Sequence, residues 1–139
     1  AAGDIIENFQ LMDQNGELVD LYSFCGNYVL IAIGAMWCPP CKEMAAEAQA
    51  HQDEFGEGNF QMLEVLIENN SSQPPSNDDL NKWADDYDMT TVPVLDDSGY
   101  ALWPYVERDW GIPTTVMIGP NMEVIAVDEY TTDPGRYIE

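Results

Sequence analysis

One segment constrains the fold of this chain more than any other: an apolar run that ends directly in two cysteines flanking two prolines. The run extends from Val29 to Trp37, the length of a buried strand and too short to cross a membrane. Pro39 and Pro40 follow Cys38, and proline suits the first turn of a helix because the N–H groups there have no intrahelical acceptor. The sequence therefore predicts a strand that leads through Cys38 into a helix.

The rest of the chain alternates between strand and helix patterns. Apolar residues at helical spacing predict a helix from Pro39 to about Phe55, ended by Gly56 and Gly58. Asn15-Gly16 between two short alternating runs predicts an N-terminal hairpin. Because strands alternate with helices, we expect an α/β domain with a sheet covered on both faces. The further predicted elements are strands at 28–35, 60–67, 114–118 and 123–127, an extended piece at 92–95, and helices at 78–87 (N-cap Asn77 or Asp78) and 100–110.

The charge of the chain excludes two classes of partner. There are 26 acidic residues against four basic ones, which gives a formal net charge of −22. Such a chain repels phosphates, so we expect neither nucleic acid nor an anionic membrane surface as a partner. The acidic residues are dispersed and form no tail, which favours a role in solubility over attraction to basic partners.

The two cysteines at this spacing form a redox pair. At the start of a helix, unpaired N–H groups and the helix dipole stabilise a thiolate, which is the attacking species in disulfide exchange. Cys38 is therefore the predicted nucleophile, and Cys41 resolves the mixed disulfide. Trp37 either shields the pair and offers partners an apolar surface or simply packs in the core.

Other uses of these cysteines fit less well. A structural zinc site needs four ligands, and the chain adds only Cys25 and His51, of which His51 lies too far along the same helix. A static disulfide across so small a loop gains little entropy. We expect Cys25 to pack as a small apolar residue and His51 to be a partly exposed helical residue.

The Trp-Cys-Pro-Pro-Cys-Lys motif at 37–42 resembles the thioredoxin superfamily, and the longer pattern resembles its extracytoplasmic TlpA/ResA-type branch in the redoxin group. Gly111-Ile112-Pro113-Thr114-Thr115 is similar to the cis-proline loop of the family. The resemblance covers nearly the whole chain and is weakest from 68 to 91. Further matching positions are Gly3, Asp4, Asn8 to Leu11, Asp13, Gly16, Leu21, Gly26, Val29 and Leu30.

This resemblance implies a thioredoxin-like fold over 1–139, with a central mixed sheet flanked by helices and an N-terminal β-hairpin extension. It implies a thiol–disulfide oxidoreductase whose partners are protein thiols and disulfides and a membrane or soluble electron donor. A cofactor, a metal and oligomerisation are not expected. Pro113 would be cis and pack against the dithiol, with Ile112 offering its backbone to a substrate peptide. The implied location is the bacterial periplasm or another extracytoplasmic site, free or tethered to a membrane before processing or truncation.

Two positions depart from the family pattern. Thioredoxin has a buried acid six residues before the nucleophile, and here Ala32 stands there. TlpA/ResA-type proteins often carry a glutamate three residues after the second cysteine, where this chain has Met44. Glu43, one residue earlier, is rotated by about 100° on the helix and is the candidate proton shuttle; water or another carboxylate is the alternative.

The residues fit three rival functions on the same fold less well. A peroxiredoxin-like thiol peroxidase would place Pro and Thr or Ser where this chain has Ile31 and Ala35. A copper chaperone would need another cysteine spacing and a better placed histidine. A non-catalytic binding module would not need both cysteines. Whether the dithiol reduces, oxidises or isomerises disulfides depends on its potential, which the spacing does not fix.

Overall fold

The computed structural model describes residues 1–106, 111–128 and 133–138 and has a mixed five-stranded sheet at its centre. The strand order is β5-β4-β3-β6-β7, with β5, β4 and β3 parallel and with β6 and β7 antiparallel to their neighbours. The predicted mixed sheet is thus confirmed. The strands are β3 (Tyr28–Gly34), β4 (Phe60–Leu66), β5 (Val94–Asp96), β6 (Thr114–Ile118) and β7 (Val124–Asp128).

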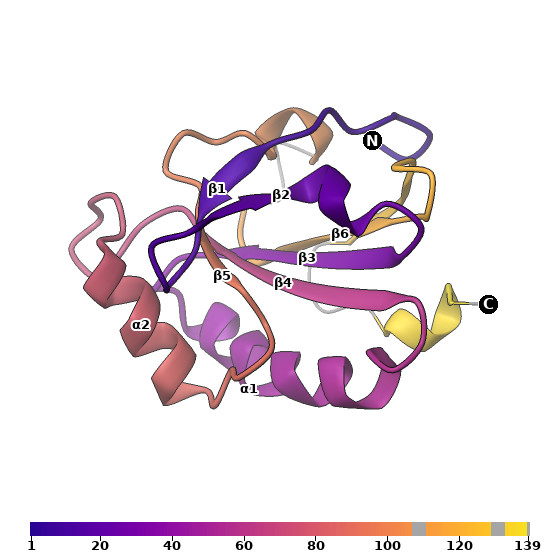
Figure 1. Cartoon of the computed structure of the whole chain (residues 1–139). Helices are drawn as coiled ribbons and strands as arrows, with labels where there is room; N and C mark the ends of the chain where they lie inside the picture. The colour runs from indigo at the N-terminus through magenta and orange to yellow at the C-terminus, as the bar shows by residue number, and fades with distance from the viewer. Residues whose placement is uncertain (107–110, 129–132, 139) are drawn as a thin grey trace.

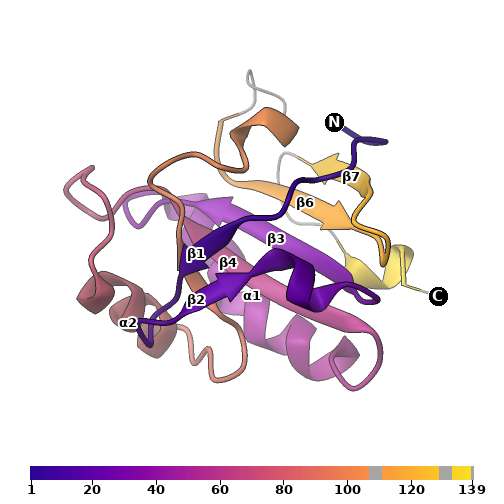
Figure 2. The same cartoon turned by 45° about the horizontal axis from the view of Figure 1, so that its top comes forward.

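The two faces of this sheet are covered differently. Helices α1 (Pro39–Phe55) and α2 (Asn77–Asp86) both lie on one face (Figure 1). The opposite face is covered by the N-terminal hairpin of β1 (Gln10–Met12) and β2 (Leu18–Asp20), as Figure 2 shows from another direction. The predicted hairpin extension and flanking helices are therefore confirmed, and each face has its own apolar cluster.

The start of α2 differs slightly from the prediction. Its N-cap is Ser76, one residue before Asn77 and two before Asp78, the two predicted N-caps. The Ser76 hydroxyl accepts a hydrogen bond from the N–H of Asp79, and the Asp79 carboxylate accepts one from the N–H of Ser76. This reciprocal capping box satisfies two N–H groups at once, which explains why the helix begins where it does.

The helix predicted at 100–110 is wrong over its described part, which contains only the short 3₁₀ helix η2 (Trp103–Tyr105). Tyr100 has a left-handed φ of 58°, which a continuous α-helix does not allow. The buried Asp97 carboxylate accepts hydrogen bonds from the N–H groups of Ala101 and Leu102, so these donors are used outside a helix. The remainder of the prediction, 107–110, lies outside the described residues.

The described residues also contain two further 3₁₀ helices, η1 (Leu21–Phe24) and η3 (Pro134–Arg136). None of the helices within the described ranges is long and apolar enough to span a bilayer.

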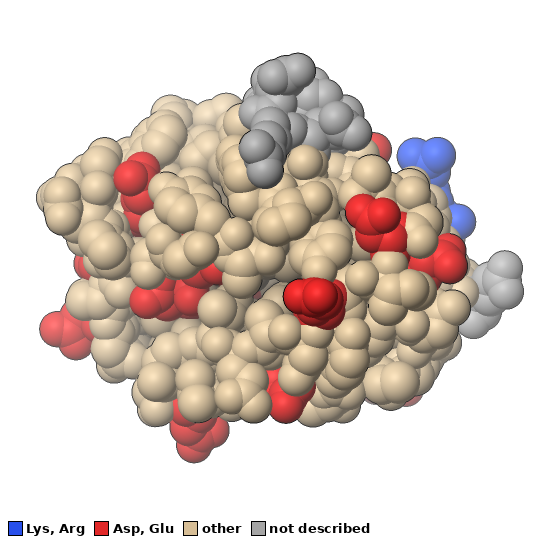
Figure 3. Space-filling model, turned by 90° about the horizontal axis from the view of Figure 1, so that it is seen from above, with Lys and Arg blue, Asp and Glu red and all other residues tan. Residues whose placement is uncertain are grey.

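On the face shown in Figure 3, acidic side chains are scattered among other residues and do not gather in one patch, as the sequence pattern predicted.

Candidate active site

The two cysteines of the motif lie at the N-terminus of α1 and are joined by a disulfide, with their Cα atoms 5.2 Å apart. Pro39 and Pro40 occupy the first two positions of α1 and are exposed. Cys38 is the N-cap, and its Sγ accepts a hydrogen bond of 3.3 Å from the backbone N–H of Cys41. In the reduced protein, the same N–H and the helix dipole would stabilise a thiolate at Cys38.

Both cysteines are buried, with exposed fractions of 3% for Cys38 and 2% for Cys41. Exposure therefore does not distinguish the two sulfurs, whereas the N-cap position of Cys38 does. Cys41, Ala45 and Ala48 are the buried residues of α1. Ala45 and Ala48 belong to the apolar cluster on the helix side of the sheet, and both cysteines belong to the cluster that also contains Ile33 and Ala35. The chemical asymmetry of the pair thus comes from the helix terminus.

Gly34, the last residue of β3, lies directly beneath Cys41. A Cβ atom added to Gly34 would lie 2.8 Å from Cys41 Sγ and 2.9 Å from Cys41 Cβ, closer than side chains approach one another. Only glycine permits the helix to approach the strand so closely at this point. In the sequence, Gly34 is only one residue of the apolar strand, because its contact is formed with a residue of another element.

Trp37 stands beside the dithiol with 45% of its surface exposed. Its indole Nε1–H donates a 2.9 Å hydrogen bond to Glu68 Oε1, and the Glu68 carbonyl accepts a bond from the N–H of Met36. Trp37 is therefore held in place from one side while part of its ring faces solvent. Of the two interpretations of Trp37, the structure rules out simple core packing.

The loop before β6 brings a distant part of the sequence to the dithiol. The Ile112–Pro113 peptide bond is cis. Thr114 pairs with Ile33 in the antiparallel register, so Pro113 comes next to the strand end at Gly34. Ile112 is half-buried and packs against the apolar cluster that contains both cysteines. The predicted site residues at 37–41 and 112–113 are thus brought together by the pairing of β3 with β6.

Glu43, the candidate shuttle, has an exposed side chain on α1, and Met44 is half-buried. The structure contains another carboxyl group that the sequence analysis missed. Glu64 lies in β4 with an exposed fraction of 4%. Burial raises the pKa of Glu64 to about 8, and the hydrogen bond from Trp83 opposes that rise. A glutamate in the otherwise apolar stretch Met62 to Ile67 was the available sequence signal.

The expectation for Cys25 is wrong. This cysteine is free and exposed, with its Sγ 3.7 Å from the Pro120 carbonyl oxygen. Cys25 follows η1 at the surface, where no apolar cluster covers it. His51 is partly buried, as expected. Within residues 1–106, 111–128 and 133–138, no three metal-ligating side chains come close enough to hold an ion.

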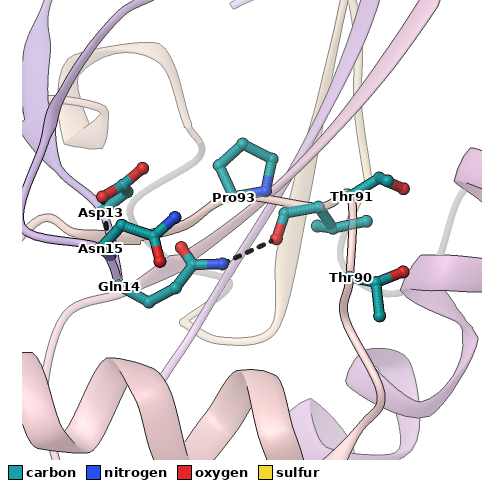
Figure 4. Close-up of a pocket in the computed structure, with 7 residues that line it drawn as sticks. Asp13, Gln14, Asn15, Thr90, Thr91 and Pro93 are labelled. Carbon is teal, nitrogen blue, oxygen red and sulfur yellow. Dashed lines mark hydrogen bonds between the residues drawn. The ribbon is translucent and has the colours of Figure 1, made fainter.

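The structure also has a small pocket away from these residues, where the hairpin turn meets the loop before β5 (Figure 4). Gln14 bridges the two segments: its Nε2 donates to the Val92 carbonyl and its Oε1 accepts from the N–H of Val94. Neither cysteine lines the pocket. Its polar groups hold the hairpin on the sheet. The lining residues are Asp13, Gln14, Asn15, Thr90, Thr91, Val92 and Pro93.

A helix that begins at a Cys-Pro-Pro-Cys disulfide, beside the central strand of this mixed sheet, defines a thioredoxin-like redox protein. The sequence profile of the AhpC/TSA family matches residues 2–127, and the chain belongs to that family. Solved structures agree on the fold: a putative thiol:disulfide interchange protein DsbE from Chlorobium tepidum has a TM-score of 0.75 at 24% identity, with 98% of this chain and 89% of that chain covered. Peroxidoxin BcpB from Mycobacterium tuberculosis has a TM-score of 0.72 at 22% identity, with 91% and 83% covered.

Curated relatives point to the same class. Thiol-disulfide oxidoreductase ResA of Halalkalibacterium halodurans is 25% identical over 91% of this chain and 67% of its own length. Thioredoxin-like protein YneN of Bacillus subtilis is 27% identical over 84% and 64%. Probable nucleoredoxin 3 of Oryza sativa subsp. japonica is 28% identical over 85% of this chain but only 22% of its own length. The chain thus spans about two thirds of the first two relatives and under a quarter of the third.

These findings confirm the predicted membership of the thioredoxin superfamily and its ResA-like redoxin group. They also agree with the predicted enzyme class, since the relative ResA is named a thiol-disulfide oxidoreductase.

Proposed function

We propose that this chain exchanges disulfides with protein substrates through Cys38 and Cys41. The observation that carries the proposal is the N-cap geometry, in which the N–H of Cys41 donates to Cys38 Sγ at the start of α1. This arrangement favours a thiolate at Cys38, and thiolate is the species that attacks a disulfide.

In the reductive direction, the Cys38 thiolate attacks one sulfur of a substrate disulfide and displaces the other as a thiolate. The Cys41 thiol then loses its proton and attacks Cys38 Sγ in the mixed disulfide. The second substrate sulfur leaves, and the Cys38–Cys41 disulfide forms. Two electrons pass from the dithiol to the substrate, and the oxidative direction is the reverse of these steps.

Three residues around the dithiol support a protein substrate. The exposed part of the Trp37 ring offers an apolar surface beside Cys38. Ile112 and Pro113, at the entry to β6, come to the same end of β3. We propose that a substrate segment lies between the Trp37 ring and this loop and pairs with the backbone of Ile112. By its resemblance to the TlpA/ResA-type branch, the protein acts outside the bacterial cytoplasm.

A test of the proposal uses reduction of insulin disulfides by the dithiothreitol-reduced protein. Cys38→Ser removes the nucleophile, so we expect activity to fall to the rate of dithiothreitol alone. Cys25→Ser is the matched control, because Cys25 is free and exposed outside the motif, and it should retain full activity. Undiminished activity in Cys38→Ser would overturn the assignment.

The same reduced protein separates the two rival functions. A thiol peroxidase consumes hydrogen peroxide, and Ile31 and Ala35 are buried apolar residues that provide no hydroxyl group for binding it. We therefore expect insulin reduction without rapid peroxide consumption. A binding module would show neither activity.

A further inference from the structure

The resolving thiol of the proposed reaction needs a proton acceptor. Cys41 is 2% exposed and packs between α1 and the end of β3, so bulk water reaches its sulfur poorly. The attack on the mixed disulfide nevertheless requires Cys41 as a thiolate. An acceptor that is buried on the same face of the sheet meets this requirement best.

The strand register brings Glu64 to that face. Ala32 pairs with Glu64, and Gly34 pairs with Leu66, in the parallel ladder of β3 and β4. Because side chains alternate along a strand, Glu64 and Ala32 point to the same face as Gly34, on which Cys41 lies. Glu64 lies on the neighbouring strand, two residues before the position that pairs with Gly34. Standard sheet spacings place the Cα atoms of Glu64 and Gly34 roughly 8 Å apart. A glutamate side chain extends over much of that distance.

Two small side chains lie on this face near Glu64 and Cys41, and Leu66, the register partner of Gly34, is the large one. Ala32, the register partner of Glu64, is the nearest residue of β3 on this face and carries only a methyl group. On α1, Ala45 is the next buried residue after Cys41. The position at which the family places a buried acid is therefore empty on β3, and the adjacent strand supplies a carboxyl group beside it.

The carboxyl group of Glu64 is only half satisfied. Trp83 Nε1–H of α2 donates to Glu64 Oε1 at 3.3 Å. Within the part of the chain that the structure describes, Glu64 Oε2 is buried and has no hydrogen-bond partner. A buried polar atom without a partner is costly and is typical of a functional group. The free oxygen can accept a proton without breaking an existing contact.

The groups around Glu64 leave it free to exchange a proton. The titratable neighbour is Tyr87, at the end of α2, which interacts electrostatically with Glu64. Strands β3 and β5 present the apolar partners Ala32 and Val94. With burial as the main cause, the pKa of Glu64 is about 8, close to the ordinary pKa of a cysteine thiol, about 8.5. A proton can thus pass between the two groups in either direction at little cost.

We propose that Glu64 is the proton acceptor for Cys41. This proposal rests on the disulfide exchange proposed above. During resolution, the Glu64 carboxylate takes the proton from the Cys41 thiol, directly or through one water molecule. The Cys41 thiolate attacks Cys38 Sγ, the Cys38–substrate bond breaks, and the substrate sulfur leaves with the electron pair. In the oxidative direction, Glu64 returns the proton to the Cys41 thiolate. The proton on Glu64 afterwards exchanges with solvent.

The two sulfurs can be followed separately with 5,5′-dithiobis(2-nitrobenzoate). Attack by Cys38 releases one thionitrobenzoate, and resolution by Cys41 releases the second, so stopped-flow absorbance resolves two phases. The measurements use a Cys25→Ser background, since the exposed Cys25 would react as well. Glu64→Gln should slow the second phase at least roughly tenfold near pH 8, where about half of the Glu64 side chains are carboxylates, and leave the first unchanged, because only Cys41 loses its base.

The pH profile distinguishes a proton acceptor from a structural residue. Because hydroxide replaces the missing base, the defect of Glu64→Gln should shrink toward pH 9, whereas a packing defect would persist. Glu64→Asp retains an acid and should give an intermediate second phase; it also replaces Glu64→Gln should that variant not fold. Glu47→Gln, an exposed glutamate of α1, is the matched control.

Several outcomes would overturn the inference. An unchanged second phase in Glu64→Gln excludes the proton acceptor, as does a defect that is independent of pH. A slow second phase in Glu43→Gln with a normal one in Glu64→Gln assigns the role to Glu43. If the Cys25→Ser protein with Glu64 intact releases no second thionitrobenzoate, the proposed function itself is overturned. That result differs from a failure of the Glu64 inference, in which the second thionitrobenzoate is still released.

Discussion

The two faces of the central strands differ in what they contain. Leu63 and Glu64 are neighbours in β4 and point to opposite sides of the sheet. On the side of Leu63, Ile31, Ile33 and Val65 form a continuous apolar cluster under the N-terminal hairpin, and the cluster reaches the two cysteines at its edge. On the helix side, the same two strands carry Ala32, Gly34 and Glu64. One face is thus built for packing, and the other interrupts the packing where the dithiol lies.

These interruptions have a cost that packing alone does not explain. A glycine inside a strand costs roughly 0.5–1 kcal/mol relative to alanine, and a buried carboxyl group is disfavoured in its charged form. Residues that break local rules in this way typically belong to functional sites. Here Gly34 makes room for Cys41, and Glu64 places a buried carboxyl group next to Ala32, on the same face of the sheet as Gly34.

The largest effect on stability is expected on the packing face. Leu63→Ala removes a fully buried side chain and should lower the free energy of unfolding by about 2–5 kcal/mol. Urea unfolding measures the loss. Disulfide exchange by the folded variant should stay near the unmodified rate, because Leu63 lies on the opposite face of the sheet from Gly34, which faces Cys41. If the folded Leu63→Ala protein has no activity, the two faces of the sheet do not have the separate roles in packing and in disulfide exchange described above.

The second effect concerns pH and the helix face. The folded-state pKa of Glu64, about 8, lies above its ordinary value of 4.5. Between these values the folded protein holds a proton that the unfolded chain has lost, so stability falls as pH rises through this window. The loss from Glu64 should be about 2–4 kcal/mol between pH 5 and pH 8.

Thermal unfolding of the unmodified protein and Glu64→Gln across this range isolates the effect. The other acidic groups are common to both proteins, so the difference between the two curves reports Glu64 alone. The Glu64→Gln curve should decline less with rising pH. Parallel curves would show that the carboxyl group does not hold its proton in the folded state.

The smallest effect on stability is expected for Gly34→Ala. The added methyl group would meet Cys41 Sγ at 2.8 Å, so the helix or the thiol must shift, at about 1–3 kcal/mol. Its effect on disulfide exchange should be larger than its effect on stability, because the displaced atom is the reacting sulfur. Gly99→Ala is the matched control, since a Cβ there meets nothing within 4 Å. Equal behaviour of the two variants would argue against the close approach.

Much of the fold could be predicted because its signals are local. The hairpin, β3, β4 and α1 lie within a residue or two of their predicted ranges, since turn residues, apolar runs and proline placement act over a few positions. The described part of the predicted helix at 100–110 failed because Asp97, from outside the segment, accepts two of its N–H groups. Cys25 was misjudged because burial depends on what packs above a turn.

For the candidate site, the sequence by itself determined the Cys38-Pro39-Pro40-Cys41 helix start and the loop at Ile112 and Pro113 that resembles a known family. These features depend on adjacent residues, so a linear pattern contains them. Only the tertiary structure decided that Gly34 lies under Cys41 and that Glu64 lies beside Ala32. Both depend on the register between β3 and β4 and on the closeness of α1, which join residues far apart in the chain.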